Sequence, residues 1–243
     1  MSMQKVFSHP KSLRDVSTHY CAGCGHGIAH RLVCEVIDEL AIREKVIAIA
    51  PVGCAVIAYD YWDFDCTEAP HGRALAVATG IKRMRPENVV FTYQGDGDLA
   101  AIGTAETIHA ANRGENLTVI FINNAVYGMT GGQMAPTTLL GQRTDTTPLG
   151  REASMGYPLK ISELLARLPA VRYVERVSLH SPAEIMKAKR AVKTAFENQV
   201  NGAGFSLVEM LSPCPTYWNM SPRKSMEWIR DVMMKEFPLG RIK

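Results

Sequence analysis

The sequence has little net charge and no apolar segment long enough to span a membrane. Lysine and arginine together number 27, and aspartate and glutamate number 24, so the formal net charge is only +3. A balance this small gives no reason to expect binding to nucleic acid or to a membrane surface. The first fifteen residues, MSMQKVFSHPKSLRD, also lack the apolar centre of a secretory signal peptide. We therefore expect a cytoplasmic protein that does not enter a membrane.

Cysteine is sparse, yet there is enough of it for a metal or redox site. Hydrophobic residues make up 47% of the 243-residue chain, which allows one large core or two small ones. Disulfides are rare in proteins of the cytoplasm, where thiols are kept reduced. The six cysteines of this chain therefore indicate a metal or redox centre rather than a disulfide framework.

Short apolar strands alternate with amphipathic helices along most of the chain. Strands are expected near 46–50, 88–93, 117–122, 171–177 and 205–210, and helices near 28–40, 74–83, 100–111, 161–168 and 182–198. This alternation predicts the α/β class, with one doubly wound, mainly parallel sheet and helices on both faces. Residues 1–243 are expected to form a single domain.

Four segments interrupt or flank this alternation. The polar arm 1–18 is expected to wrap over the surface or over a partner. Residues 59–65 predict an irregular crossing. Residues 134–159 form a loop long enough to predict a functional lid or a partner contact. The tail 217–243 is expected to dock on a partner rather than to fold alone.

Polar side chains follow two neighbouring strands at the point where each strand ends. Asp96 lies between Gly95 and Gly97, where the backbone can approach a ligand closely, and Asn124 follows the next strand. The N–H groups at the start of the intervening helix suit a phosphate. A carboxylate oxygen and an amide oxygen meeting at one sheet edge predict a Mg²⁺ site. An ordinary turn of a doubly wound fold is the simpler alternative, and a dinucleotide site is weaker because no GxGxxG motif opens this unit.

Four cysteines are expected at the same edge of the sheet. Cys54 and Cys214 each follow a strand, and Cys21 and Cys24 form a CxxC loop before the first helix. Four thiolates gathered there suit a [4Fe–4S] cluster. A structural zinc site is the competing interpretation, although only one CxxC is present where such sites commonly pair two. A thioredoxin-type redox pair would leave Cys54 and Cys214 without a role.

Six motifs, in order, give the sequence a close resemblance to a known family. They are YCAGCGHG, APVGC, APHGRA, YQGDGD, INNAVYGMTGGQMAPTT and SPCPT, and they span residues 20–216. Together they resemble the thiamine-diphosphate-binding β subunit of the 2-oxoacid:ferredoxin oxidoreductases. The resemblance implies that Asp96, Asn124 and the carbonyl of Val126 hold Mg²⁺, and that Cys21, Cys24, Cys54 and Cys214 hold a [4Fe–4S] cluster.

The resemblance also implies an activity. A 2-oxoacid, with 2-oxoglutarate favoured and a branched-chain 2-oxoacid next, is oxidatively decarboxylated to acyl-CoA and CO₂, and electrons pass to ferredoxin. A glutamate must activate the coenzyme, and Glu106 and Glu115 lie at its wrong end. The family implies that a partner α subunit supplies this glutamate, with γ and δ subunits as further partners. The alternatives are a non-redox thiamine-dependent decarboxylase or synthase subunit, which leaves the cysteines idle, and a binding module whose site has decayed.

Further residues are expected near the coenzyme. His71 opens a helix at the same edge and is predicted to contact cofactor or substrate, with a local hydrogen bond as an equal alternative. His19 and His26 flank the CxxC loop, where they could tune the cluster or serve only as loop histidines. Cys34 is expected in the core, and Cys66 is left without a role. The remaining predicted cofactor contacts are Gly72, Gly95, Gly97, Asp98, Gly128, Thr130 and Cys54.

Overall fold

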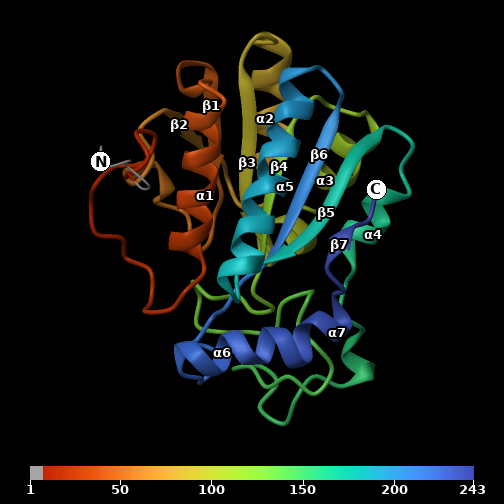
Figure 1. Ribbon diagram of the computed structural model, residues 1–243. Coiled ribbons are helices and arrows are strands. Elements are labelled where there is room, and N and C mark those ends of the chain that lie inside the picture. Colours follow the sequence, from red (N-terminus) through yellow and green to blue (C-terminus); the bar gives the residue numbers. More distant parts are fainter. Residues whose placement is uncertain (1–7) are drawn as a thin grey trace.

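The computed structural model describes residues 8–243 and shows one seven-stranded sheet with helices on both faces (Figure 1). The strand order is β2-β1-β3-β4-β6-β5-β7, and every neighbouring pair is parallel except β5 and β7. The predicted doubly wound, mainly parallel α/β fold is thus confirmed. The strands are β1 (Val46–Ala50), β2 (Asp65–Glu68), β3 (Val89–Gly95), β4 (Thr118–Asn123), β5 (Val171–Ser178), β6 (Phe205–Leu211) and β7 (Gly240–Arg241).

Helices cover both faces of this sheet and bury a separate core on each. Helices α1 (His26–Glu39) and α5 (Pro182–Val200) pack together on one face (Figure 1). Helices α2 (Ala74–Met84), α3 (Thr104–Asn112) and α4 (Ile161–Ala166) lie on the opposite face. Because both faces are covered, the central strands β3 and β4 are buried along nearly their whole length, which explains their continuous apolar character.

Strand β2 was not expected. The irregular crossing predicted for residues 59–65 is present up to residue 64, and the chain then pairs Asp65–Glu68 with β1 as a parallel edge strand. This strand is short, polar and half-exposed, so its sequence has no apolar run to reveal it. Its residue Cys66 packs against the core beneath α1 and α5, and Cys34 is fully buried in that core, as expected.

The helix after β3 begins differently from the expectation. Residues Asp98–Ile102 form a π-helical turn, and the α-helix starts only at Thr104. The wider turn stands directly after the Gly95–Gly97 segment. Single π turns of this kind are frequent at functional sites.

The C-terminal tail folds onto the chain itself. It contains α6 (Pro222–Trp228), α7 (Met234–Glu236) and β7, which pairs with β5. The expectation that the tail would not fold without a partner was therefore wrong, and docking of its outer surface stays a prediction. A third core forms below the carboxyl ends of the strands, where the tail side chains Trp218, Ile229, Met233 and Phe237 pack with Ala125, Val126 and Leu211.

Part of the N-terminal arm is also packed on the chain. The expectation for residues 1–7 lies outside the described residues. Further on, the Ser12 hydroxyl donates to Asp38 Oδ1 at 2.5 Å, and Leu13 forms a β-bridge with Trp62. The arm therefore wraps over α1 and the segment before β2. Among residues 8–243, no helix combines the length and the apolar composition needed to cross a bilayer.

Candidate functional site

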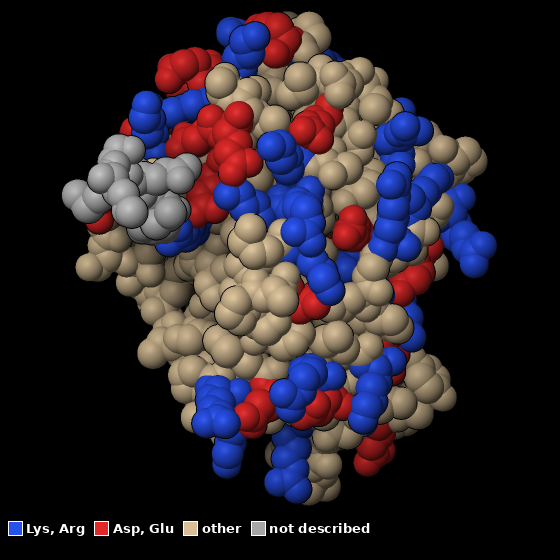
Figure 2. Space-filling model, viewed as in Figure 1, with Lys and Arg blue, Asp and Glu red and all other residues tan. Residues whose placement is uncertain are grey.

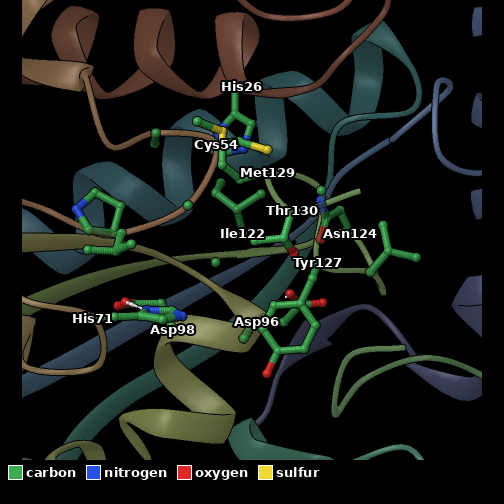
Figure 3. Close-up of a pocket in the computed structure, with 18 residues that line it drawn as sticks. His26, Cys54, His71, Asp96, Asp98, Ile122, Asn124, Tyr127, Met129 and Thr130 are labelled. Carbon is green, nitrogen blue, oxygen red and sulfur yellow. Dashed lines mark hydrogen bonds and ion pairs between the residues drawn. The ribbon is translucent and has the colours of Figure 1, made fainter. Parts of the chain in front are cut away.

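A pocket opens at the carboxyl ends of β1, β3 and β4, where the parallel strands bring distant segments together. Figure 3 shows Asp96, Asn124 and Tyr127 on one side of it and His26 and Cys54 on another. Most residues predicted to contact a cofactor line this pocket: Cys54, His71, Gly95, Asp96, Gly97, Asp98, Asn124, Val126, Gly128 and Thr130.

The carboxylate of Asp96 is almost completely buried at this pocket. Its Oδ1 accepts a hydrogen bond from the Gly97 N–H at 2.8 Å, and its Oδ2 accepts one from the Thr137 hydroxyl at 2.5 Å. Burial raises the pKa of Asp96 to about 7, and these donors only partly oppose that rise. Among the described residues, no cationic side chain is recorded beside this carboxylate. A cation is therefore the partner that the site chemistry calls for.

The loop after β4 is held in a strained shape. Ala125 has a φ of 57°, a left-handed conformation that an L-residue with a side chain seldom adopts. Its carbonyl accepts from the Thr138 hydroxyl at 2.7 Å, and the neighbouring Asn124 carbonyl accepts from the Trp218 indole N–H at 3.0 Å. These bonds fix the turn that separates Asn124 from Val126. The positions of the two predicted metal ligands on either side of Ala125, Asn124 and the Val126 carbonyl, are therefore fixed by contacts from elsewhere in the chain.

His71 and Asp98 hold one another at the rim of the pocket. His71 Nδ1 forms an ion pair or hydrogen bond with Asp98 Oδ1, and the same oxygen accepts from the Gly72 N–H at 2.9 Å. Asp98 Oδ2 accepts from Gln94 Nε2 at 2.6 Å. Gly72 itself is not among the described residues that line the pocket. The cofactor contact predicted for Gly72 stays a prediction, and in the structure its N–H fixes the Asp98 carboxylate.

A second pocket gathers all four predicted cluster cysteines, Cys21, Cys24, Cys54 and Cys214. A Cβ added to Gly128 would come within 2.8 Å of Cys54 Sγ and 3.9 Å of Cys214 Sγ, so this glycine permits the close approach of its loop to both sulfurs. No group of three or more His, Cys, Asp or Glu within residues 8–243 is arranged to hold a single metal ion.

Burial controls the protonation of the Cys54 and Cys214 thiols. It raises the pKa of Cys54 and of Cys214 to about 12, and the other cysteines add to this effect through their like charge. Each thiol therefore remains protonated near neutral pH unless a metal replaces its proton. The CxxC loop is the more open side of the pocket, because Cys21 is exposed.

The two pockets share a wall. Their common lining residues are His26, Cys54, Asn124, Gly128 and Met129, and Figure 3 shows the first two next to Met129. A molecule held by the Asp96 side is therefore separated from the cysteine side by single side chains. The site can therefore place a ligand of the Asp96 side directly beside a group held by the cysteines.

His26 is the first residue of α1 and is buried, so it is not the plain loop histidine that was one of its two expected roles. Its Nδ1 lies 2.8 Å from the Tyr93 hydroxyl, and its ring stacks on Tyr20 with centroids 4.7 Å apart. Behind it, His30 Nε2 lies 2.7 Å from the Tyr20 hydroxyl. By contrast, His19 is at the surface, where its ring nitrogens contact the Tyr61 hydroxyl and the Cys54 carbonyl.

The two buried histidines make stability depend on pH. Burial lowers the pKa of His26 to about 3 and that of His30 well below its usual range. Below the unfolded pKa of about 6.5, the unfolded chain binds protons that the folded chain refuses, so stability falls as pH falls. Each histidine contributes a slope of about 1.4 kcal/mol per pH unit.

We expect urea unfolding at pH 5.0, 5.5, 6.0 and 6.5 to show this effect in the His30→Gln variant. Its stability should fall less steeply than that of the wild type, by about 1.4 kcal/mol per pH unit. Replacing the exposed His109 by Gln is the control and should leave the slope unchanged. Equal slopes for His30→Gln and the wild type would contradict the prediction. The raised pKa of Asp96 also makes stability depend on pH, but it does so equally in the wild type and in His30→Gln, so its contribution cancels from the difference in slope.

Sequence reasoning missed several residues that shape the site. Thr137, Gln94 and Trp218 each bond to a predicted site residue or its neighbour from another segment. Thr137 lies in the MAPTT motif and Gln94 in YQGDGD, so the motifs contained the signal without the role. Nothing near Trp218 in the sequence links it to the loop after β4.

Comparison with known proteins identifies the family. Residues 52–210 match the family described as thiamine pyrophosphate enzyme, C-terminal TPP binding domain. The ketoisovalerate oxidoreductase subunit VorA of Methanothermobacter thermautotrophicus is 53% identical over 97% of this chain and 52% of its own length. The 2-oxoglutarate synthase subunit KorB of Archaeoglobus fulgidus is 38% identical over 88% of this chain and 76% of its own length. The chain belongs to the thiamine-diphosphate-binding subunits of the 2-oxoacid:ferredoxin oxidoreductases.

A solved structure supports this assignment to the 2-oxoacid:ferredoxin oxidoreductase subunits. The 2-oxoglutarate:ferredoxin oxidoreductase from Magnetococcus marinus, with 2-oxoglutarate, coenzyme A and succinyl-CoA bound, superposes with a TM-score of 0.79. The sequence identity is 28%, and the match covers 94% of this chain and 74% of that chain. The present chain spans about half the length of the VorA relatives. The resemblance found in the sequence is therefore confirmed.

Proposed function

We propose that this chain is the subunit that holds thiamine diphosphate and relays electrons in an oxidoreductase that converts a 2-oxoacid and CoA to acyl-CoA and CO₂. The shared wall between the Asp96 pocket and the four-cysteine pocket carries the proposal. An electron released on one side has only side chains such as His26 and Cys54 to pass before it reaches the other. Ferredoxin is the proposed final acceptor.

Asp96, Asn124 and the Val126 carbonyl would hold Mg²⁺ and, through it, the diphosphate. The donor set fits, because Mg²⁺ prefers oxygen ligands and the buried Asp96 carboxylate lacks a cationic partner among the described residues. When bound, thiamine diphosphate supplies the electron sink that lets CO₂ leave the 2-oxoacid. Beyond its chain neighbours, no atom of the described residues lies within 4 Å of where a Cβ of Gly95 would stand, so the backbone there can approach a ligand closely, whereas the missing side chain of Gly97 makes room for the Tyr127 ring. His71, fixed by Asp98, also lines the pocket.

Cys21, Cys24, Cys54 and Cys214 would hold a [4Fe–4S] cluster. Their side chains line one pocket and come from three separate segments of the chain. The single CxxC and the adjoining Asp96 pocket favour a redox cluster over a structural zinc ion, which transfers no electrons. Gly128 leaves space beside Cys54 and Cys214.

The residues that line the pocket support the proposal of a partner subunit. No glutamate lines it among the described residues, and thiamine diphosphate needs one for activation. Glu106 instead pairs with Arg73, and Glu115 pairs with Arg83 and Arg113, and neither glutamate lines the pocket. We propose that an α subunit supplies the glutamate and that γ and δ subunits complete a cytoplasmic complex. The outer face of the 134–159 loop exposes Leu149 and Tyr157 for such a contact.

The identities favour a branched-chain 2-oxoacid as substrate. The ketoisovalerate relative is 53% identical, whereas the 2-oxoglutarate relative from Archaeoglobus fulgidus is 38% identical. This reverses the order of the two substrates expected from the sequence alone. 2-Oxoglutarate stays as the second candidate.

The test is a substrate panel on the complex that co-purifies anaerobically with this chain. We expect about four iron and four sulfide per chain, and reduction of a viologen dye that requires both CoA and a 2-oxoacid. Ketoisovalerate should give the highest kcat/KM, followed by 2-oxoglutarate. A complex that releases CO₂ without reducing the dye, and that contains no iron, would instead support a non-redox decarboxylase or synthase. Turnover by the isolated chain would contradict the partner requirement.

A further inference from the structure

The loop 134–159 is fixed rather than free. Most of its bonds stay inside the loop: the Thr144 and Thr147 hydroxyls lie 2.6 Å apart, and the Gly141 N–H donates to the Arg151 carbonyl at 2.8 Å. Thr137, Thr138, Thr144 and Thr147 are all buried. A lid that opens by unfolding would first have to break these contacts. The lid and the partner contact expected for 134–159 both stay predictions, and the internal bonds show that the loop has a fixed shape of its own.

Arg151 is the centre of the loop. Its guanidinium donates to five backbone carbonyls and is only 6% exposed. Nη1 reaches the carbonyls of Ala135, Pro136 and Thr138 at 3.3, 2.9 and 2.6 Å. Nε and Nη2 reach those of Gly156 and Tyr157 at 2.9 and 3.0 Å. Nη1 thus shares its two N–H groups among three carbonyls, while Nε and Nη2 donate one bond each. Only arginine offers such a planar set of donors on one side chain.

The segment 135–138, whose carbonyls accept hydrogen bonds from Arg151, contacts the coenzyme site directly. Thr137 lies between Pro136 and Thr138, whose carbonyls both accept from Arg151. Its hydroxyl donates to Asp96 Oδ2 at 2.5 Å. The carbonyl of Thr138 accepts from Arg151, and its hydroxyl donates to the carbonyl of the strained Ala125 at 2.7 Å. The contacts therefore run from Arg151 through one short peptide to the carboxylate and to the turn between Asn124 and Val126.

Arg151 is buried without an acidic partner. Among residues 8–243, no carboxylate is recorded in an ion pair with it, and its charge is balanced by carbonyl dipoles alone. Burying a cation in this way is unfavourable unless its hydrogen bonds are complete. A leucine or methionine at this position would pack without the free-energy cost of burying a charge. The contribution of Arg151 therefore comes from its hydrogen bonds to the loop carbonyls.

We propose that Arg151 is a positioning residue of the coenzyme site. It holds Thr137 and Thr138 in register, and these residues in turn orient the Asp96 carboxylate and the turn at Ala125. This inference rests on the proposed binding of thiamine diphosphate and Mg²⁺ at Asp96. It predicts that a residue outside the pocket lining sets coenzyme affinity before any substrate is bound.

A double-mutant cycle between Arg151 and Thr137 tests the proposal. The dissociation constant of thiamine diphosphate at fixed Mg²⁺ is measured by calorimetric titration for the full chain, for Arg151→Met, for Thr137→Val and for the double variant. Each single variant should bind about tenfold more weakly, which corresponds to about 1.4 kcal/mol. Because both act through the same hydroxyl, the double variant should bind no more weakly than the worse single variant.

Matched controls separate this role from a general loss of folding. Arg143→Lys alters an exposed arginine of the same loop and should bind as the wild type does. Trypsin cleavage after Arg143 in the coenzyme-free chain should be faster in Arg151→Met, which reports the loosened loop without any coenzyme. Should Arg151→Met fail to fold, Arg151→Lys replaces it in the same cycle and should weaken binding about threefold, because lysine can keep only part of the five bonds.

The outcomes are distinguishable. Wild-type affinity in Arg151→Met, or losses that multiply to about 100-fold in the double variant, would overturn the positioning role. Failure of the wild-type chain itself to bind thiamine diphosphate would instead reject the proposed function. Faster cleavage together with wild-type affinity would show that Arg151 orders the loop without setting the coenzyme site.

Discussion

Replacing Asp96 by Asn is expected to weaken Mg²⁺-dependent binding of thiamine diphosphate by at least about 100-fold. The substitution keeps the size of the side chain and can keep the hydrogen bonds at Thr137 and Gly97. It removes the negative charge that a divalent cation requires. Even indirect supports of a metal site cost about 10- to 100-fold in affinity when they are lost, so loss of a ligand should cost more. Calorimetric titration of the full chain with coenzyme and Mg²⁺ measures the change.

Asp98→Asn is the matched control in the same pocket. Both aspartates are buried and follow β3, but the Asp98 carboxylate is already occupied by His71, the Gly72 N–H and Gln94. We therefore expect Asp98→Asn to lower thermal stability and to change coenzyme affinity by less than tenfold. If the two variants lost affinity equally, Asp96 would not be the metal ligand and the site would have to be reassigned.

The second large effect is expected at Glu209, which lies fully buried beneath the loop after β4. Its two carboxylate oxygens accept from Asn123 Nδ2 at 2.7 Å, from the Ser162 hydroxyl at 2.5 Å and from Arg176 Nε at 2.8 Å. Arg176 is equally buried, and its guanidinium lies over the ring of Phe237. This network joins α4, β4, β5, β6 and the C-terminal tail around one charge pair.

Glu209→Ala should reduce the free energy of unfolding of the chain by about 3–5 kcal/mol. The reason is that removing one partner of a buried ion pair leaves the other charge without compensation. Urea unfolding at pH 7 measures the loss. Glu209→Gln keeps the shape and two of the hydrogen bonds and should lose less. A loss below about 1 kcal/mol in Glu209→Ala would mean that Glu163, at the outer end of the network, satisfies Arg176 alone.

The same variant carries information about the site. The Asn123 side chain that Glu209 holds accepts the Ala125 N–H at 3.3 Å through its Oδ1. Asn123 is the first residue of the Asn–Asn pair in the sequence motif, and its partner Asn124 lines the pocket. The pair therefore combines a supporting residue and a predicted ligand. We expect a second, smaller effect of Glu209→Ala on coenzyme affinity.

Much of the fold and of the site could be predicted because a parallel sheet has a simple rule. All its strands end at one edge, so residues that follow different strands must meet there. That rule brings Asp96, Asn124, Cys54 and Cys214 to one place from sequence spacing alone, and the structure gathers them in two adjoining pockets. The motifs then named the family, which the comparisons confirm.

Other features could not be predicted because they depend on contacts between segments far apart in the chain. Strand β2 exists because β1 offers it an edge, and its own polar sequence gives no sign of it. The tail folds because Trp218 and Phe237 find a core already formed under the strand ends. Arg151 resembles any loop arginine until five carbonyls are placed around it.

The sequence by itself determined the α/β fold, the family and the residues that meet at the strand ends, because these follow from local periodicity, spacing and motif. Only the tertiary structure decided the wall shared by the two pockets, the buried histidines and the supports of Asp96 and Ala125. The physical reason is that a side chain acquires its hydrogen-bond partners and its protonation state only after distant segments have packed and excluded water.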